Sequence, residues 1–211
     1  MIADIWFDVA CPWCYIGKRN WEEALSRFPG EVETRWRAFE LRPGYFTEPG
    51  PALREIMFTE WGMTEEEIRA VVERVTRAGH AAGVECRIGE VRPVSTFDAH
   101  RLAKLGAGSG LAGEVIERLF RAYHTDLANV ADRGLLTELG VAAGLARAEV
   151  ERLWDGDAYA GEIAADQALG NEAGVTAVPS YRVGGHARAR NGALSPGDLL
   201  ALLRSAAAAS G

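Results

Sequence analysis

Strand patterns occur only near the two ends of the chain. A short apolar stretch over residues 2–9 and an alternating run over residues 32–39 predict two strands. Residues 15–28, which lie between them, predict a helix. Near the C-terminus, residues 178–183 predict a third strand, and residues 186–191 predict its hairpin partner.

The middle of the chain has apolar positions at helical spacing instead. Thr64 and Glu67 form a capping box at the start of one such stripe. Further stripes predict four more helices, over residues 95–105, 111–123, 135–143 and 148–154. After the last predicted strand, Ser195 and Pro196 are typical of an N-cap and a first helical position, so a final helix is expected to begin there.

The order of these elements indicates the fold class. A strand–helix–strand opening and a strand–strand–helix close complete one small α/β unit, and a block of helices interrupts it. This is the order of a thioredoxin-like fold with a large inserted all-helical domain. We expect residues 1–40 and 167–211 to form the thioredoxin-like domain and residues 41–166 to form the helical insertion.

Charge and length narrow the possible partners. The chain has 211 residues, a formal net charge of −7 and an isoelectric point near 5.2. Nucleic acid and anionic membranes favour basic surfaces, so neither is expected as a partner. No run approaches the roughly 18 apolar residues of a membrane span. Because the first predicted strand begins at Ile2, we expect no signal peptide and a cytoplasmic location.

Two cysteines stand where the first helix is expected to begin. Cys11 and Cys14 frame a Cys-Pro-Trp-Cys run at the end of the first predicted strand. A helix N-terminus has unpaired N–H groups and a partial positive charge, which stabilise a thiolate. Cys14 lies one turn further on, close enough to attack a mixed disulfide on Cys11. The spacing therefore predicts thiol–disulfide exchange.

A metal site is the main alternative for such a cysteine pair. Structural zinc usually takes four ligands, and the other candidates are Cys86 and four histidines, none of which forms a second close pair. A c-type haem would need histidine at the position of Tyr15. We therefore expect no metal, and we expect Cys86 to be a small buried apolar residue.

Two further polar residues have competing interpretations. Asp8, three residues before Cys11, could accept a proton from Cys14 or could be an acid that stabilises the helix start. His100 lies among apolar residues on a predicted helix, which favours a structural role.

Four segments resemble the DsbA family, and specifically its FrnE-like branch. The resemblance runs from end to end in the same order. The matching segments are the Cys-Pro-Trp-Cys-Tyr-Ile-Gly run at residues 11–17, Phe-Glu-Leu-Arg-Pro at 39–43, Ala-His-Arg-Leu at 99–102 and Gly-Val-Thr-Ala-Val-Pro at 174–179.

The resemblance implies a thiol–disulfide oxidoreductase that acts on protein or small thiol and disulfide substrates. Cys11 would be the exposed nucleophile and Cys14 the buried resolving cysteine. The Val178-Pro179 bond would be cis, in a loop that lies against the cysteine pair. The implied substrate-binding residues are Pro12, Trp13, Val178 and Pro179.

No cofactor is expected beyond the cysteine pair itself, although glutathione remains open as a co-substrate. A homodimer is one option for the oligomeric state. The rival function is a glutathione-dependent isomerase or transferase of the same fold, of the 2-hydroxychromene-2-carboxylate isomerase or kappa-class glutathione transferase type. Those relatives typically replace the nucleophilic cysteine by serine, whereas this chain has both Cys11 and Cys14.

Overall fold

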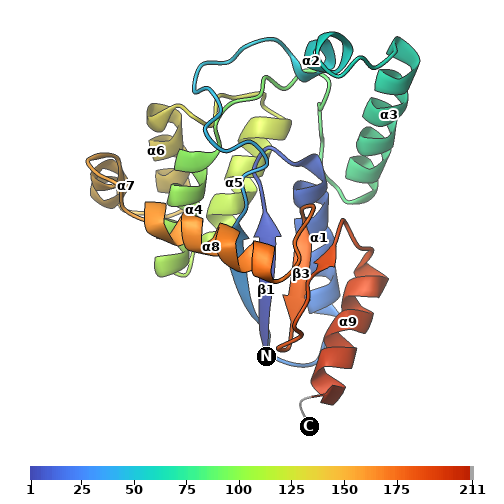
Figure 1. Cartoon of the computed structure of the whole chain (residues 1–211). Helices are drawn as coiled ribbons and strands as arrows, with labels where there is room; N and C mark the ends of the chain where they lie inside the picture. The colour runs from blue at the N-terminus through green and yellow to red at the C-terminus, as the bar shows by residue number, and fades with distance from the viewer. Residues whose placement is uncertain (210–211) are drawn as a thin grey trace.

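A mixed β-sheet forms the centre of the molecule (Figure 1). The computed structural model describes residues 1–209, and within them the strand order is β2-β1-β3-β4. β1 is parallel to β2 and antiparallel to β3, which is antiparallel to β4. The strands are β1 (Ile2–Phe7), β2 (Glu33–Ala38), β3 (Ser180–Val183) and β4 (Arg190–Asn191).

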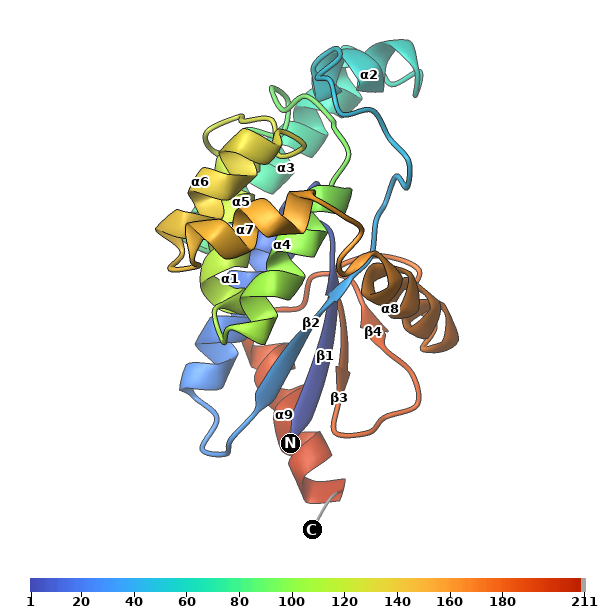
Figure 2. The same cartoon turned by 90° about the vertical axis from the view of Figure 1, so that its left-hand side faces the viewer.

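Helices cover both faces of this sheet (Figure 2). α1 (Pro12–Ser26) and α9 (Pro196–Ala209) pack together on one face, and α8 (Ala160–Glu172) lies across the other. β1 is one of the two inner strands and lies between these helix layers, which explains why it is buried from its second residue onward. The thioredoxin-like arrangement expected from the element order is confirmed.

The helical insertion has two parts. α4 (Phe97–Gly108) and α5 (Ala112–His124) pack against α6 (Arg133–Ala142), while α7 (Arg147–Trp154) packs on α4 and α6. α2 (Leu53–Thr59) and α3 (Glu65–Ala81) stand apart from them at the top of Figure 1. No helix among residues 1–209 is both long and apolar enough to span a membrane.

The helix predictions are largely confirmed. The capping box at the start of α3 is present, with Thr64 and Glu67 each bonded to the other's backbone N–H. At the start of α9, the N–H of Asp198 donates to Ser195 Oγ at 3.1 Å. The hairpin partner of β3 is shorter than predicted, because only Arg190–Asn191 pair with it.

The expected boundary between residues 166 and 167 falls inside α8, which packs on β2 as one continuous helix. Trp6 Nε1 donates to the backbone oxygen of Asp166 at 2.9 Å, and the N–H of Ala38 donates to its carboxylate at 2.9 Å. We therefore place all of α8 with the thioredoxin-like domain, so that the insertion ends before Ala160. The insertion and the sheet also share one core, in which Phe7 of β1 contacts Phe120 of α5.

Candidate active site

Cys11 is the N-cap of α1. Its backbone is extended, with φ −91° and ψ 113°, and Pro12 follows as the first helical residue. Proline suits that position because its fixed φ is helical and its missing N–H would have no helical partner. The Cys11 side chain makes no capping hydrogen bond to the helix. Its sulfur therefore lies at the positive end of the helix without being bound to the N–H groups of the helix.

The two sulfurs of the pair interact directly. Both cysteines are reduced in this structure. Burial raises the pKa of Cys14 well above its ordinary value, and the hydrogen bond and charge interaction with Cys11 add to this effect, while a backbone hydrogen bond at Asp8 opposes it. Cys14 is therefore a protonated thiol at neutral pH while Cys11 is reduced.

Cys11 is less exposed than the sequence analysis expected. Only 6% of it is accessible, against 1% of Cys14. The reason is tertiary: α2 and α3 of the insertion line the space in front of it, and the cis-proline loop lies beside it. Cys11 is reached through a cleft rather than from an open surface.

The Val178-Pro179 peptide bond is cis. The Cys11 thiol donates to the carbonyl oxygen of Val178 at 3.3 Å, across 167 positions in the chain. Gly17 makes this approach possible, because a Cβ at that position would stand 2.6 Å from Tyr181 Oη and 2.9 Å from Pro179 Cγ. The glycine of the Cys-Pro-Trp-Cys-Tyr-Ile-Gly run thus sets the distance between the active-site helix and the loop.

Asn191 holds the cis-proline loop from β4. Its side-chain oxygen accepts from the N–H of Thr176 at 2.8 Å and from Ser180 Oγ at 2.8 Å. Its Nδ2 donates to the carbonyl oxygen of Gly174 at 3.0 Å. Sequence reasoning missed this role. The sequence signal that could have shown it was the Asn191-Gly192 pair, which marks a turn at the end of the hairpin. Gly192 adopts φ +93° there.

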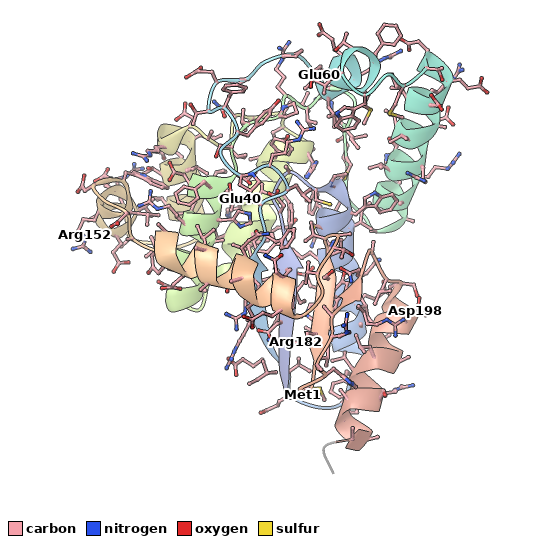
Figure 3. The ribbon with its side chains drawn as sticks, in the orientation of Figure 1. Met1, Glu40, Glu60, Arg152, Arg182 and Asp198 are labelled. Carbon is pink, nitrogen blue, oxygen red and sulfur yellow. The ribbon has the colours of Figure 1, made fainter. Side chains whose placement is uncertain are left out.

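Asp8 has structural partners. Its carboxylate accepts from the backbone N–H of Ala10 at 3.2 Å and of Leu41 at 2.7 Å, and His100 Nε2 lies 3.4 Å away. Burial alone would raise the pKa of Asp8, but His100 and the N–H of Leu41 outweigh it and hold that pKa below its ordinary value. Glu40, labelled at the centre of Figure 3, lies near this pair, and burial raises its pKa. These contacts favour the structural interpretations of Asp8 and His100.

A cleft of about 230 Å³ opens in front of Cys11. Its walls are mainly apolar and come from the active-site loop, from α2 and from α3, with Met57 and Val75 among the lining residues. Trp13 lines the cleft and also packs against the buried core.

Cys86 does not line the cleft, although it is close enough to Cys11 for their charges to interact. It is 2% exposed, as expected for a small buried apolar residue, and burial raises its pKa to about 12. Within residues 1–209, no three side chains of histidine, cysteine, aspartate or glutamate are grouped to hold a metal ion.

The sheet order, the cysteine pair at the N-terminus of α1 and the adjoining cis-proline loop define a thioredoxin-like protein with a helical insertion. A family model described as the DSBA-like thioredoxin domain matches residues 2–204. The chain belongs to that family.

Known proteins resemble the whole chain. The crystal structure of a probable DsbA oxidoreductase, SCO1869 from Streptomyces coelicolor, is 32% identical with a TM-score of 0.90, and the match covers 99% of this chain and 90% of that one. The uncharacterized protein YwbO of Bacillus subtilis is 29% identical over 85% of each chain.

The fold is shared with another kind of enzyme. A 2-hydroxychromene-2-carboxylate isomerase structure is 16% identical, with a TM-score of 0.69 over 100% of this chain and 96% of that one. That likeness shows the fold alone.

Proposed function

We propose that this protein is a thiol–disulfide oxidoreductase whose catalytic residues are Cys11 and Cys14. One observation supports it above all. A reduced cysteine pair stands at the N-terminus of α1, with Cys11 facing both the cleft and the carbonyl oxygen of Val178. That arrangement provides a nucleophile, a resolving thiol and a place for the substrate.

The exchange takes two steps. The Cys11 thiolate attacks one sulfur of a substrate disulfide, forms a mixed disulfide and releases the other half of the substrate as a thiolate. Cys14 then loses its proton and attacks the Cys11 sulfur, which releases the second half and leaves a Cys11–Cys14 disulfide. Two electrons pass from the protein to the substrate. Oxidation of a substrate dithiol is the same sequence reversed.

The pKa of Cys14 changes between these two steps. Interaction with Cys11 is one of the causes that raise the pKa of Cys14 in the reduced pair. Formation of the mixed disulfide removes the negative charge from Cys11, so that the pKa of Cys14 falls when its attack is required. Burial remains, and it keeps Cys14 protected from competing thiol reagents.

The cis-proline loop is proposed to hold the substrate beside Cys11. The Val178 carbonyl already accepts from the Cys11 thiol and would be released when Cys11 forms a mixed disulfide. Pro12, Trp13 and Pro179 are the neighbouring surfaces proposed to contact the substrate. The cytoplasmic location, the FrnE-like branch and glutathione as co-substrate stay predictions.

The rival isomerase or transferase function shares the fold, so the fold does not decide between the two. The retained Cys11 favours the oxidoreductase, because the rival chemistry takes its thiol from bound glutathione.

Reduction of insulin by dithiothreitol tests the oxidoreductase function. Wild-type protein should accelerate the reaction, and Cys11→Ser should abolish the acceleration. Equal acceleration by Cys11→Ser would refute the assignment.

A trapping experiment identifies the resolving residue. Cys14→Ser should accumulate mixed disulfides on Cys11, measured as a mass increase that dithiothreitol reverses. Cys86→Ser is the matched control, since Cys86 is equally buried but outside the pair, and it should trap nothing above the wild-type level.

A further inference from the structure

The cleft in front of Cys11 is lined by a cation without a carboxylate partner. Arg42 lies on the segment between β2 and α2, and its guanidinium stacks over the rings of Tyr45 at 5.1 Å and Trp61 at 5.5 Å. Trp61 follows Glu60, which Figure 3 labels at the end of α2. No carboxylate among residues 1–209, Glu60 included, forms an ion pair with Arg42. Arg42 therefore brings a positive charge without an ion-pair partner to the wall of the cleft.

A second arginine contacts a residue of the cleft wall, although it does not line the cleft itself. Arg74 of α3 stacks over the ring of Trp13 at 5.9 Å, and Trp13 lines the cleft next to Cys11. Arg74 likewise forms no ion pair within the described part of the chain. Aromatic faces hold both guanidinium groups while leaving their N–H donors available to an anion.

Asp8, the carboxylate that lines the cleft, forms no ion pair with Arg42. Asp8 accepts from the N–H groups of Ala10 and Leu41 and lies beside His100, so these groups already stabilise its negative charge. The chain as a whole has a net charge of −7, so an arginine without an ion-pair partner in the wall of an apolar cleft is a local reversal of its general charge. A cleft of this kind selects for an anionic ligand with an apolar body.

We propose that the cleft binds a small thiol or disulfide substrate that combines an aromatic or otherwise apolar body with a carboxylate. The body lies against Trp13, Met57 and Val75, and the carboxylate is bound by Arg42. The volume of about 230 Å³ suits roughly one substituted aromatic ring. This inference rests on the proposed function, because Cys11 must react with the bound sulfur.

An anionic aromatic disulfide, 5,5′-dithiobis(2-nitrobenzoate), is the probe for this site. The Cys11 thiolate displaces one thionitrobenzoate and forms a mixed disulfide with the other. The Cys14 thiol then displaces the second thionitrobenzoate, losing one proton and forming the Cys11–Cys14 disulfide. Two electrons pass to the probe. The neutral comparison is 4,4′-dithiodipyridine, which reacts by the same steps at pH 8.

The variants separate charge from structure. Arg42→Met should lower the second-order rate constant for the anionic probe about tenfold, the effect of one charge-assisted hydrogen bond. It should change the rate for the neutral probe less than about twofold. Arg42→Lys keeps the charge and should retain most of the preference. Arg204→Met makes the same charge change on α9, far from the cleft, and should leave the ratio of the two rates at the wild-type value.

Each other outcome has a distinct meaning. If Arg42→Met slowed the reactions with both probes equally, or kept the wild-type ratio of the two rate constants, the proposed substrate class would be overturned. The proposed function would stay intact. A wild-type protein whose Cys11 reacts with neither probe would overturn the proposed function and the inference with it. Loss of the preference in Arg42→Met but not in Arg42→Lys or Arg204→Met supports the proposal.

Discussion

A methyl group at Gly17 tests whether the active-site helix and the cis-proline loop are held at a fixed distance. Alanine there would place its Cβ 2.6 Å from Tyr181 Oη and 2.9 Å from Pro179 Cγ. Both distances are shorter than normal non-bonded contacts, so the helix and the loop must separate. Because Val178 precedes Pro179, its contact with Cys11 should be lost with them.

The magnitude follows from two opposing contributions. Replacing a helical glycine by alanine stabilises a protein by up to about 1 kcal/mol, whereas overpacking a tight contact costs about 1–3 kcal/mol. Gly113, near the start of α5, is the matched control because a Cβ there meets nothing within 4 Å. The free energy of unfolding of Gly17→Ala should therefore lie about 1–3 kcal/mol below that of Gly113→Ala.

Urea denaturation measures this difference, and insulin reduction measures its effect on the site. Displacement of a reacting group by about 1 Å can cost about a hundredfold in rate, so Gly17→Ala should reduce activity at least severalfold while Gly113→Ala keeps it. Adding Tyr181→Phe removes the closer of the two clashing atoms and should restore part of the stability. If Gly17→Ala matched Gly113→Ala in both stability and activity, the steric reasoning would be refuted.

Three other predictions follow from the same structure. Asn191→Ala removes all of the side-chain hydrogen bonds that Asn191 makes to the cis-proline loop and should slow insulin reduction, whereas Asn191→Asp keeps the acceptor contacts and should retain more activity. Burial lowers the pKa of His124 to about 4, so the folded protein excludes a proton that the unfolded chain binds. The free energy of unfolding should therefore fall by about 3 kcal/mol as the pH drops from 6.5 towards 4. Urea titrations at several pH values should show a weaker pH dependence of this free energy in His124→Asn and an unchanged one in the exposed control His80→Asn. With a pKa raised to about 12, Cys86 is about one part in ten thousand thiolate at pH 8. Native alkylation should therefore label Cys86 far more slowly than Cys11, and Cys86→Ala should leave the redox potential unchanged; equal labelling of the two would contradict this.

Local sequence determined most of the elements and the chemistry at the start of α1. Periodic apolar positions and the Thr64–Glu67 capping box mark helices because both signals act within one or two turns. The cysteine pair is equally local, since its spacing and the following helix are contiguous in the chain. α8 was not predicted as a separate helix, because its many alanines show no one-sided apolar pattern.

Tertiary structure decided what surrounds the pair. The contact of Cys11 with Val178 spans 167 positions, and the hydrogen bonds of Asn191 to the cis-proline loop join two segments of a hairpin. The burial of Cys11 depends on α2 and α3, which the sequence places 40 or more residues away. Periodicity describes which face of one element is apolar, but it does not give the distance between two elements. The cleft, with Arg42 in its wall, forms only when the insertion packs beside the sheet. No local pattern in the sequence could therefore predict it.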